Sequence, residues 1–390
     1  MRIVINGIGV AGPALAYWLN RSGHEVVIVE QAPRLRTAGY IVDFWGIGYD
    51  IVEQMGLIDE VRALGYQVRE VRYVDKDGKK KGGFNTDIFK RLTNGRFTSV
   101  RRSDISATIY RAIEGKVETI FGDSVASIDD SGDILRVGFD HAPERLADIV
   151  VGADGLHSRV RSIIFGNEAE FETSLDYHVA AFEAKGYAPR DELIFISHGL
   201  PGRQISRFSM REDSTLFLFV FRNKYMEGAG TGAKEILHRV FDGAGWEWPQ
   251  IATELDRATD IYIDSVSQIR MEHWTRDRIA LAGDAGACVS LMAGEGTGLA
   301  IAEGYVLAGE LQASGGDIAT AFARYEQRLM PLLRTKQQAA AKFASSFAPG
   351  TALGIAIRNQ VTRLMGLPLV ADLAIGRAMR DDIELPRYDF

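Results

Sequence analysis

The sequence predicts an α/β protein with a Rossmann-like parallel sheet, an inserted, mostly antiparallel β-sheet domain and a C-terminal helical segment. Three observations predict this fold class. The first residues follow the order strand, glycine turn, helix, strand, which is the order of a parallel βαβ unit. The middle of the chain holds apolar or alternating runs of strand length between Gly and Asp, as in an antiparallel sheet. The last part carries apolar residues at helical spacing.

Length and composition indicate an ordinary globular protein. The chain has 390 residues, of which 46% are hydrophobic and 25% are charged, and its formal net charge is −7. A nucleic-acid partner is not expected, because phosphate-binding surfaces need an excess of Lys and Arg. A single Cys excludes an intramolecular disulfide and a cysteine-rich zinc site. With no signal-peptide pattern and no apolar run of membrane-spanning length, we expect a cytoplasmic protein without a metal or a membrane span.

The first unit carries a dinucleotide-binding pattern. "RIVIN" predicts a strand, "GIGVAG" supplies Gly7, Gly9 and Gly12, Pro13 opens a predicted helix, and "HEVVIVE" predicts a second strand ending at Glu30. In such a unit the first glycine permits the turn, the second lets a pyrophosphate approach, and the third allows helix packing. The helix N-terminus faces the negative charge of the pyrophosphate. Glu30, at the end of the second strand, can accept hydrogen bonds from ribose hydroxyl groups. The alternative is a glycine-rich turn without a ligand.

Three further stretches carry polar residues at strand or helix ends. In "FTSVRRSDISATIYRAI", Arg102 precedes a helix that Ser103 or Asp104 is expected to cap. "ADIVVGADGLHSRVRSIIFG" predicts a strand, then Asp154 and a helix that contains Arg161. "GDAGACVSLMAGEGTG" follows a strand in the same way and ends in glycines that open an apolar helix. So many glycines in this last stretch indicate a close approach to the backbone, unless the turn alone requires them.

These motifs, in this order and over nearly the whole chain, resemble group A flavoprotein monooxygenases, which have the para-hydroxybenzoate hydroxylase fold. The resemblance rests on GxGxxG with Glu30, the Arg102 stretch, "DGxxSxxR" from Asp154 to Arg161, and "GDA…GxG" from Gly283 to Gly296. It implies an extended FAD whose ADP half lies on the glycine turn and Glu30. It also implies that Arg102 contacts the middle of FAD, that Asp284 binds the ribityl chain, and that Asp154 serves both FAD and a passing NAD(P)H.

The resemblance also implies residues around the flavin ring. Arg36, before "TAGY", matches an arginine near the cofactor, and Asp43, in "AGYIVDFWG", is expected near the ring. Gly294 and Gly296 would let backbone N–H groups and a helix N-terminus approach the ring edge, which becomes anionic on reduction. The alternative for this motif is a plain strand–turn–helix with Asp284 as the N-cap.

The motif departs from its relatives in two places. Ala287 stands where many relatives have His, and Ser290-Leu291 stand where many have a pair of prolines beside the flavin. These differences leave the shape of the loop in front of the flavin open. Cys288, in the same loop, is interpreted as a small buried filler rather than a nucleophile, because no His or Asp partner is visible near it. The sequence identifies no catalytic acid or base.

The predicted function is that of an FAD-dependent monooxygenase. NAD(P)H, bound only transiently because one Rossmann unit is present, would reduce FAD, and O2 would supply one oxygen atom to an aromatic or polycyclic small molecule. The long C-terminal helices resemble those of the tetracycline-inactivating branch, so a tetracycline-like antibiotic is a candidate substrate. Two alternatives remain: a flavoprotein reductase or dehydrogenase that works without O2, and a catalytically idle flavin-binding protein.

The chain divides accordingly into three predicted parts. They are a discontinuous FAD-binding domain (residues 1–70, 97–170 and 271–312), a substrate domain (71–96 and 171–270) and C-terminal helices (313–390). In the substrate domain some side chains could face a ligand, although structural roles are favoured: His198, Arg203, Arg207 and Arg222. The C-terminal helices, which Pro331 is expected to interrupt, are interpreted as packing on the core, with attachment to a membrane surface as the alternative.

Overall fold

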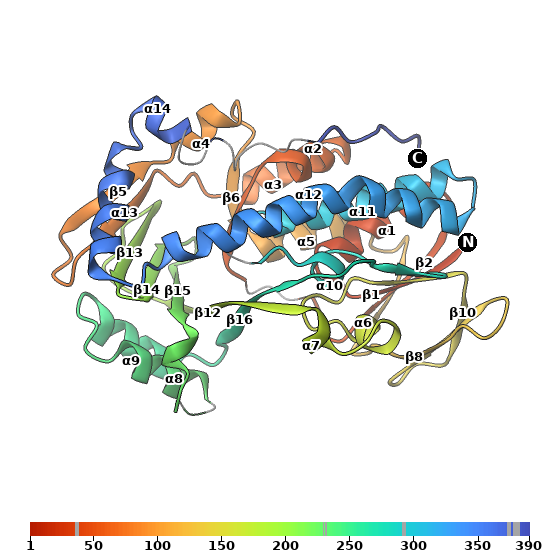
Figure 1. Cartoon of the computed structure of the whole chain (residues 1–390), viewed down its shortest axis with the longest axis horizontal. Helices are drawn as coiled ribbons and strands as arrows, with labels where there is room; N and C mark the ends of the chain where they lie inside the picture. Colours follow the sequence, from red (N-terminus) through yellow and green to blue (C-terminus); the bar gives the residue numbers. More distant parts are fainter. Residues whose placement is uncertain (36–38, 229, 231, 291–293, 373–375, 377–382) are drawn as a thin grey trace.

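A parallel sheet and a larger antiparallel sheet lie side by side in the computed structural model of the chain. A long C-terminal helix, α12 (Ile318–Phe347), runs across both (Figure 1). The structure describes residues 1–35, 39–228, 230, 232–290, 294–372, 376 and 383–390, with the backbone alone at 343–346 and 368–369. The predicted mixed α/β class with C-terminal helices is confirmed. Arg36 and Leu291, singled out in the sequence, lie outside the described residues.

The parallel sheet has the strand order β17-β18-β11-β1-β2-β7, in which only β17 runs antiparallel. Its strands are β1 (Arg2–Asn6), β2 (Glu25–Glu30), β7 (Glu118–Phe121), β11 (Ile149–Gly152), β17 (Thr275–Arg276) and β18 (Ile279–Leu281). Helices α1 (Ala11–Arg21), α5 (Arg102–Ile113) and α11 (Gly296–Ala313) pack together beside it. The predicted βαβ unit is therefore present, but its helix begins at Ala11, two residues before Pro13, which still lies in the first turn.

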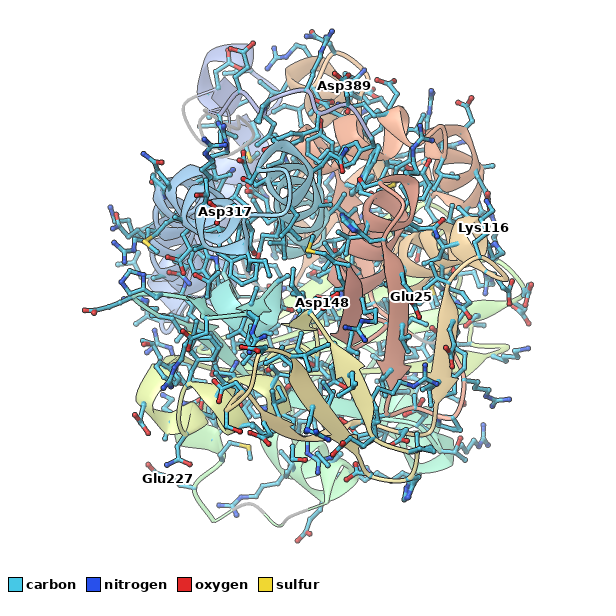
Figure 2. All side chains as sticks on the ribbon, turned by 90° about the vertical axis from the view of Figure 1, so that its right-hand side faces the viewer. Glu25, Lys116, Asp148, Glu227, Asp317 and Asp389 are labelled. Atoms are coloured by element: carbon cyan, nitrogen blue, oxygen red, sulfur yellow. The ribbon has the colours of Figure 1, made fainter. Side chains whose placement is uncertain are left out.

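The amino ends of the parallel strands lie at the end of the molecule that faces the viewer in Figure 2. Glu25, at the start of β2, and Asp148, just before β11, both lie there. Because neighbouring strands are parallel, their carboxyl ends all point the opposite way, toward the antiparallel sheet. Ligands of such sheets bind at the carboxyl ends of the strands, and the predicted motifs follow these ends.

The antiparallel sheet has the order β16-β12-β15-β14-β13-β4-β5, in which only β13 and β4 pair in parallel. Its strands are β4 (Glu70–Val74), β5 (Lys80–Asn85), β12 (Glu172–Lys185), β13 (Ile194–Leu200), β14 (Arg203–Ser209), β15 (Ser214–Arg222) and β16 (Tyr262–Ile269). The early hairpin β4–β5 joins this sheet, as predicted. Two amphipathic helices, α8 (Ala233–Phe241) and α9 (Trp248–Arg257), cover one of its faces.

Smaller elements complete the described chain. Two short sheets pair β3 (Ile41–Phe44) with β6 (Thr98–Arg101), and β9 (Leu135–Phe139) with both β8 (Val125–Asp129) and β10 (Arg145–Ala147). The shorter helices are α2 (Gly46–Gln54), α3 (Ile58–Leu64), α4 (Asp87–Leu92), α6 (Arg159–Ile164), α7 (Glu168–Phe171), the 3-10 turn η1 (Asn223–Tyr225) and α10 (Asp284–Ala287).

The C-terminal segment corrects one prediction. Helix α12 (Ile318–Phe347) continues through Pro331 instead of ending there. A proline inside a helix removes one hydrogen bond and costs about 3 kcal/mol, but Leu329, Leu332 and Leu333 are buried in the core on both sides of it. After α12 come α13 (Ala352–Leu364) and α14 (Pro368–Ala371). Within the described residues, no helix is long and apolar enough to cross a bilayer.

Candidate cofactor site

The three glycines of the β1–α1 turn differ in what surrounds them. Gly7 has φ +111°, and a Cβ built on it would lie 2.4 Å from the carbonyl oxygen of Ala153. A Cβ on Gly12 would lie 2.0 Å from the carbonyl oxygen of Gly7. A Cβ on Gly9 would meet nothing closer than Nη2 of Arg102, at 3.9 Å. Packing of the chain therefore requires Gly7 and Gly12, whereas Gly9 leaves space beside the backbone, as a bound pyrophosphate would need.

Glu30 lies at the rim of this turn. Its Oε2 accepts the backbone N–H of Ile8 at 2.9 Å, and its Oε1 accepts the N–H of Ala32 at 2.7 Å. Two backbone donors hold the carboxylate in one orientation, and each oxygen keeps a second lone pair. The side chain is thus placed and able to accept ribose hydroxyl groups.

Arg102 lies between this turn and the "GDA" motif. Helix α5 begins with Arg102 itself and has Arg101 as its N-cap, not Ser103 or Asp104 as predicted. The half-buried guanidinium faces Tyr40 and Asp284. Burial lowers the pKa of Arg102, but these facing groups outweigh burial and raise it overall. A cation held between two backbone turns is suited to a pyrophosphate.

Asp284 opens α10 directly after a strained glycine. Gly283 has φ +66°, its N–H donates to Oε2 of Glu303 at 2.7 Å, and a Cβ on it would lie 3.0 Å from the Cβ of Ala11. Asp284 is only half-buried, and a Cβ on Gly296 would lie 3.9 Å from its Oδ1. The carboxylate therefore lies just before the N-terminus of α11, accessible to a hydroxyl-bearing chain.

Asp43 marks the other end of the site. It lies on β3, its Oδ1 accepts the hydroxyl of Ser99 at 2.5 Å, and burial raises its pKa. Asp43 borders one small cavity with Glu295 and Gly298, at the beginning of α11. Gly294, with φ +69°, lies close to the ring of Trp45, which borders the same cavity. Asp43 is thus brought to the beginning of α11, beside Glu295 and Gly298, and Gly294 lies near Trp45 of the same cavity.

The contacts of Asp154 are internal. Its carboxylate accepts Nδ2 of Asn6 at 2.9 Å, Oγ of Ser158 at 2.6 Å, and the backbone N–H groups of Arg159 and Val160 at 2.8 and 3.2 Å. Asp154 therefore joins β1 to the loop after β11 and holds the first turn of α6. Its predicted role toward FAD and NAD(P)H remains a prediction.

Arg161 couples the two acidic motifs. Its side chain is fully buried, and it donates to the carbonyl oxygens of Ala285 at 2.9 Å and Leu156 at 2.6 Å. It also forms an ion pair with Glu168 at 2.7 Å. The arginine of "DGxxSxxR" thus positions the helical turn that carries Asp284.

Sequence reasoning missed the residues of α12 that hold the loop before α11. Gln337 donates from Nε2 to the carbonyl oxygens of Ile269 at 2.7 Å and Cys288 at 3.1 Å. Lys336 is buried and lies 2.5 Å from the carboxylate of Glu295. These residues belong to the polar run "RTKQQ", which is typical of a solvent-facing helix side, so no local signal indicates them.

The departures from the family pattern are buried. Ala287 and Ser290 are both buried, and Ser290 has φ +97°. The Sγ of Cys288 lies 3.6 Å from the carbonyl oxygen of Ser267, and burial raises the pKa of the thiol well above its usual value. A protonated, buried thiol agrees with the predicted role of a filler.

The four polar candidates of the antiparallel sheet bind protein atoms. Both ring nitrogens of His198 lie within 3.1 Å of backbone carbonyl oxygens, and buried Arg207 pairs with Asp191 and Glu247 at 2.6 and 2.7 Å. Arg203 donates to a backbone carbonyl oxygen, and Arg222 lies 3.8 Å from an aspartate. Their contacts are structural, which is the role the sequence favoured.

The predicted residues therefore lie next to one another in succession, from Glu30 and the glycine turn through Arg102 and Asp284 to the start of α11 and Asp43, which suits an extended dinucleotide. The sequence profile of the FAD binding domain family matches residues 1–317, and the chain belongs to this family of flavin-dependent monooxygenases. It is 36% identical, over 83% of its length and 88% of the relative's, to Uncharacterized protein Rv1260 of Mycobacterium tuberculosis.

Two further similarities extend along the chain. A flavin-dependent monooxygenase of an unknown prokaryotic organism is 31% identical over 350 residues, which are 89% of this chain and 90% of that protein. The crystal structure of tetracycline destructase Tet(55) matches with a TM-score of 0.85 and 29% identity, over 99% of this chain and 98% of that one. The cofactor is FAD, as predicted.

Proposed function

We propose that the enzyme uses NAD(P)H and O2 to hydroxylate an aromatic or polycyclic small molecule, with tetracycline-like compounds as the first class to test. The observation that carries this proposal is the extent of the similarity to a tetracycline destructase, which includes the C-terminal helices as well as the FAD-binding part. In this chain α12 reaches the loop in front of the flavin through Lys336 and Gln337. The same helix thus borders both the cofactor and the antiparallel sheet.

The second face of the antiparallel sheet supports an apolar substrate. On β15, Phe217, Phe219 and Phe221 are buried in the cluster that contains α8 and α9. The intervening Leu218 and Val220 point to the opposite face, where α12 lies and where Leu218 is only half-buried. An apolar face that α12 leaves only partly covered suits a flat, largely apolar ligand. A surface groove of about 350 Å3 is bordered by Tyr66 and Met210, which belong to an apolar cluster that Leu218 also joins, and none of the described cofactor residues borders it.

We assign the cofactor contacts to the residues that the site brings together. The ADP half would lie on Gly7, Gly9, Gly12 and Glu30; Arg102 would neutralise the pyrophosphate; Asp284 would accept hydrogen bonds from ribityl hydroxyl groups; and Asp43, Gly294 and Gly296 would border the ring. Bound FAD supplies the redox chemistry by taking electrons from NAD(P)H and passing them to O2. The chain would orient FAD and the substrate and exclude water. No catalytic acid or base is assigned. The predicted division into an FAD-binding domain, a substrate domain and C-terminal helices is part of this proposal.

The test begins with the FAD-loaded enzyme without oxygen. NADPH or NADH should bleach the flavin, and air should restore its colour. A tetracycline or phenol that is a substrate should then raise O2 consumption and appear as a product with one added oxygen atom. Turnover of an organic acceptor without O2 would instead support the reductase alternative. A flavin that neither NADPH nor NADH reduces would support the idle protein.

One variant tests the position of the substrate. Leu218→Glu places a charge on the apolar face beside α12 and should raise KM at least about tenfold, because a carboxylate disfavours an apolar ligand there. Leu146→Glu is the matched control, since Leu146 is an exposed leucine of β10 in a different sheet. Equal KM values in both variants would contradict the proposed position.

A further inference from the structure

The outer side of α13 is apolar. Among the described residues, seven large hydrophobic side chains are exposed, and five of them lie between residues 353 and 367. They are Leu353, Ile357, Val361, Leu364 and Leu367, with exposed fractions of 71, 55, 41, 52 and 56%. We call these five residues the α13 stripe. A contiguous exposed stripe of this kind marks a binding surface more often than an accident of packing.

The stripe lies opposite the side of α13 that packs on the protein. On that inner side Thr362 is buried and accepts the backbone N–H of Gly83 at 3.1 Å, and Asn359 lies against Gly82 of β5. With 3.6 residues per turn, Ile357 points to the side of the helix opposite Asn359 and Thr362. The helix thus uses its polar side to bind the sheet and leaves its apolar side outward, the reverse of an ordinary surface helix.

Basic residues flank the stripe. Residues 343–371 contain two arginines and no acid. Arg358 points inward, over the ring of Tyr73, so Arg363 is the arginine beside the stripe. Arg363 lies on α13 itself, and the hairpin segment Lys79–Lys81 leads directly into the part of β5 that contacts α13. Lys80 and Lys81 pair with acids of the same hairpin, whereas the charged groups of Lys79 and Arg363 form no ion pair among the described residues. The molecule has a net charge of −7, so this surplus of positive charge is local.

We propose that the α13 stripe binds an anionic lipid surface, with α13 parallel to the bilayer at the left end of the molecule in Figure 1. An apolar helix face bordered by cations, without the length to span a bilayer, is typical of interfacial helices. Anionic headgroups supply the negative charge that residues 343–371 lack.

A second copy of the chain is a poorer occupant. Pairing two α13 stripes would add a second Arg363 to the interface, with no acid on either helix to compensate the two charges. One helix with five exposed apolar side chains also offers far less than the about 20–30 residues per partner of a stable interface. The charge and the size of the surface therefore both favour lipid.

The test is sedimentation of the full-length, FAD-loaded protein with vesicles of phosphatidylcholine alone, or of equal parts phosphatidylcholine and phosphatidylglycerol. We expect binding to the mixed vesicles that weakens with salt, and little binding to the neutral ones. Ile357→Glu with Leu364→Glu should abolish it, and Leu146→Glu should not. Lys79→Gln with Arg363→Gln should weaken it about thirtyfold, since each basic residue near an anionic surface contributes a factor of about five.

Two measurements keep the result decisive. Flavin absorbance and Tm of each variant show that it is folded, which is expected because all the substituted side chains are exposed. Analytical ultracentrifugation without lipid measures self-association. The proposal is overturned if the wild-type protein ignores the mixed vesicles. It is also overturned if Leu146→Glu is as damaging as the stripe variant, or if the stripe variant only dissolves a dimer.

Discussion

Glu303 is a buried carboxyl group that should make the stability of the enzyme depend on pH. It lies in the middle of α11, is 2% exposed, and accepts the N–H of Gly283 at 2.7 Å and the hydroxyl of Tyr325 at 3.3 Å. Burial, together with the nearby charge of Asp284, raises its pKa from 4.5 to about 8. The folded protein therefore keeps a proton on Glu303 in a range where the unfolded chain has lost it.

The sign follows from this difference in bound protons. Between the two pKa values, 4.5 and about 8, unfolding releases a proton, so rising pH destabilises the folded state. At 1.36 kcal/mol per pKa unit, the wild-type protein loses about 3 kcal/mol through Glu303 alone between about pH 5 and pH 8. With an unfolding entropy of about 2 cal/mol/K per residue, this loss corresponds to about 4 °C in Tm for a chain of this length.

Glu303→Gln removes this titration and keeps a carbonyl oxygen to accept the N–H of Gly283. The assay is Tm of the FAD-loaded wild-type and variant proteins across this pH range, where other titrating groups cancel in the difference. The Tm of the variant minus the Tm of the wild-type protein should increase by about 4 °C from about pH 5 to pH 8. Tyr325→Phe, which keeps the carboxyl group, should retain the wild-type slope. Parallel Tm curves for the wild-type and Glu303→Gln proteins would refute the reasoning.

Three further changes test the site and its surroundings. Lys336→Met should destabilise the protein by about 1–3 kcal/mol because it removes the cation 2.5 Å from the mostly buried carboxylate of Glu295, and adding Glu295→Gln should restore more than half of this in urea unfolding. Gly12→Ala should cost about 1–3 kcal/mol by overpacking, whereas Gly9→Ala should keep the Tm of the FAD-free protein but weaken FAD binding at least about tenfold, measured by flavin fluorescence. The packing roles would be wrong if both alanines lowered Tm alike. Deleting residues 386–390 should lower Tm by several degrees because the last ring packs on α1, and an unchanged Tm would contradict that role.

The parts of the fold that sequence predicts well are those with local causes. The βαβ unit follows from apolar runs, a turn that needs φ > 0 at Gly7, and an acid at the strand end. The residues after strands β11 and β18 could be placed together because parallel strands share their carboxyl edge. Each of these arguments uses neighbours in sequence or one general rule of sheet geometry.

The errors and omissions have non-local causes. Pro331 looked like a helix end because a proline weakens its own helix, and only packing of α12 on the core, invisible in sequence, outweighs that cost. Lys336 was missed because its partner, Glu295, lies about forty residues earlier in the chain and belongs to another element. The outward apolar side of α13 has the same origin: periodicity shows that a helix has an apolar side, but not what that side faces.

Near the loop in front of the flavin, side chains from distant elements hold backbone that many relatives restrict with local proline residues. Many relatives stiffen this loop with a pair of prolines, whose rings restrict φ, and here Ser290 stands at one of those positions. Two side-chain amides hold the preceding backbone instead. Gln337 donates to the carbonyl oxygen of Cys288, and Gln268 donates to the carbonyl oxygens of Val289 at 3.0 Å and Gln337 at 2.8 Å. Because α12 and β16 supply these amides, the residues that lead into this loop are held by the same elements that border the apolar face, so their position depends on the C-terminal arrangement.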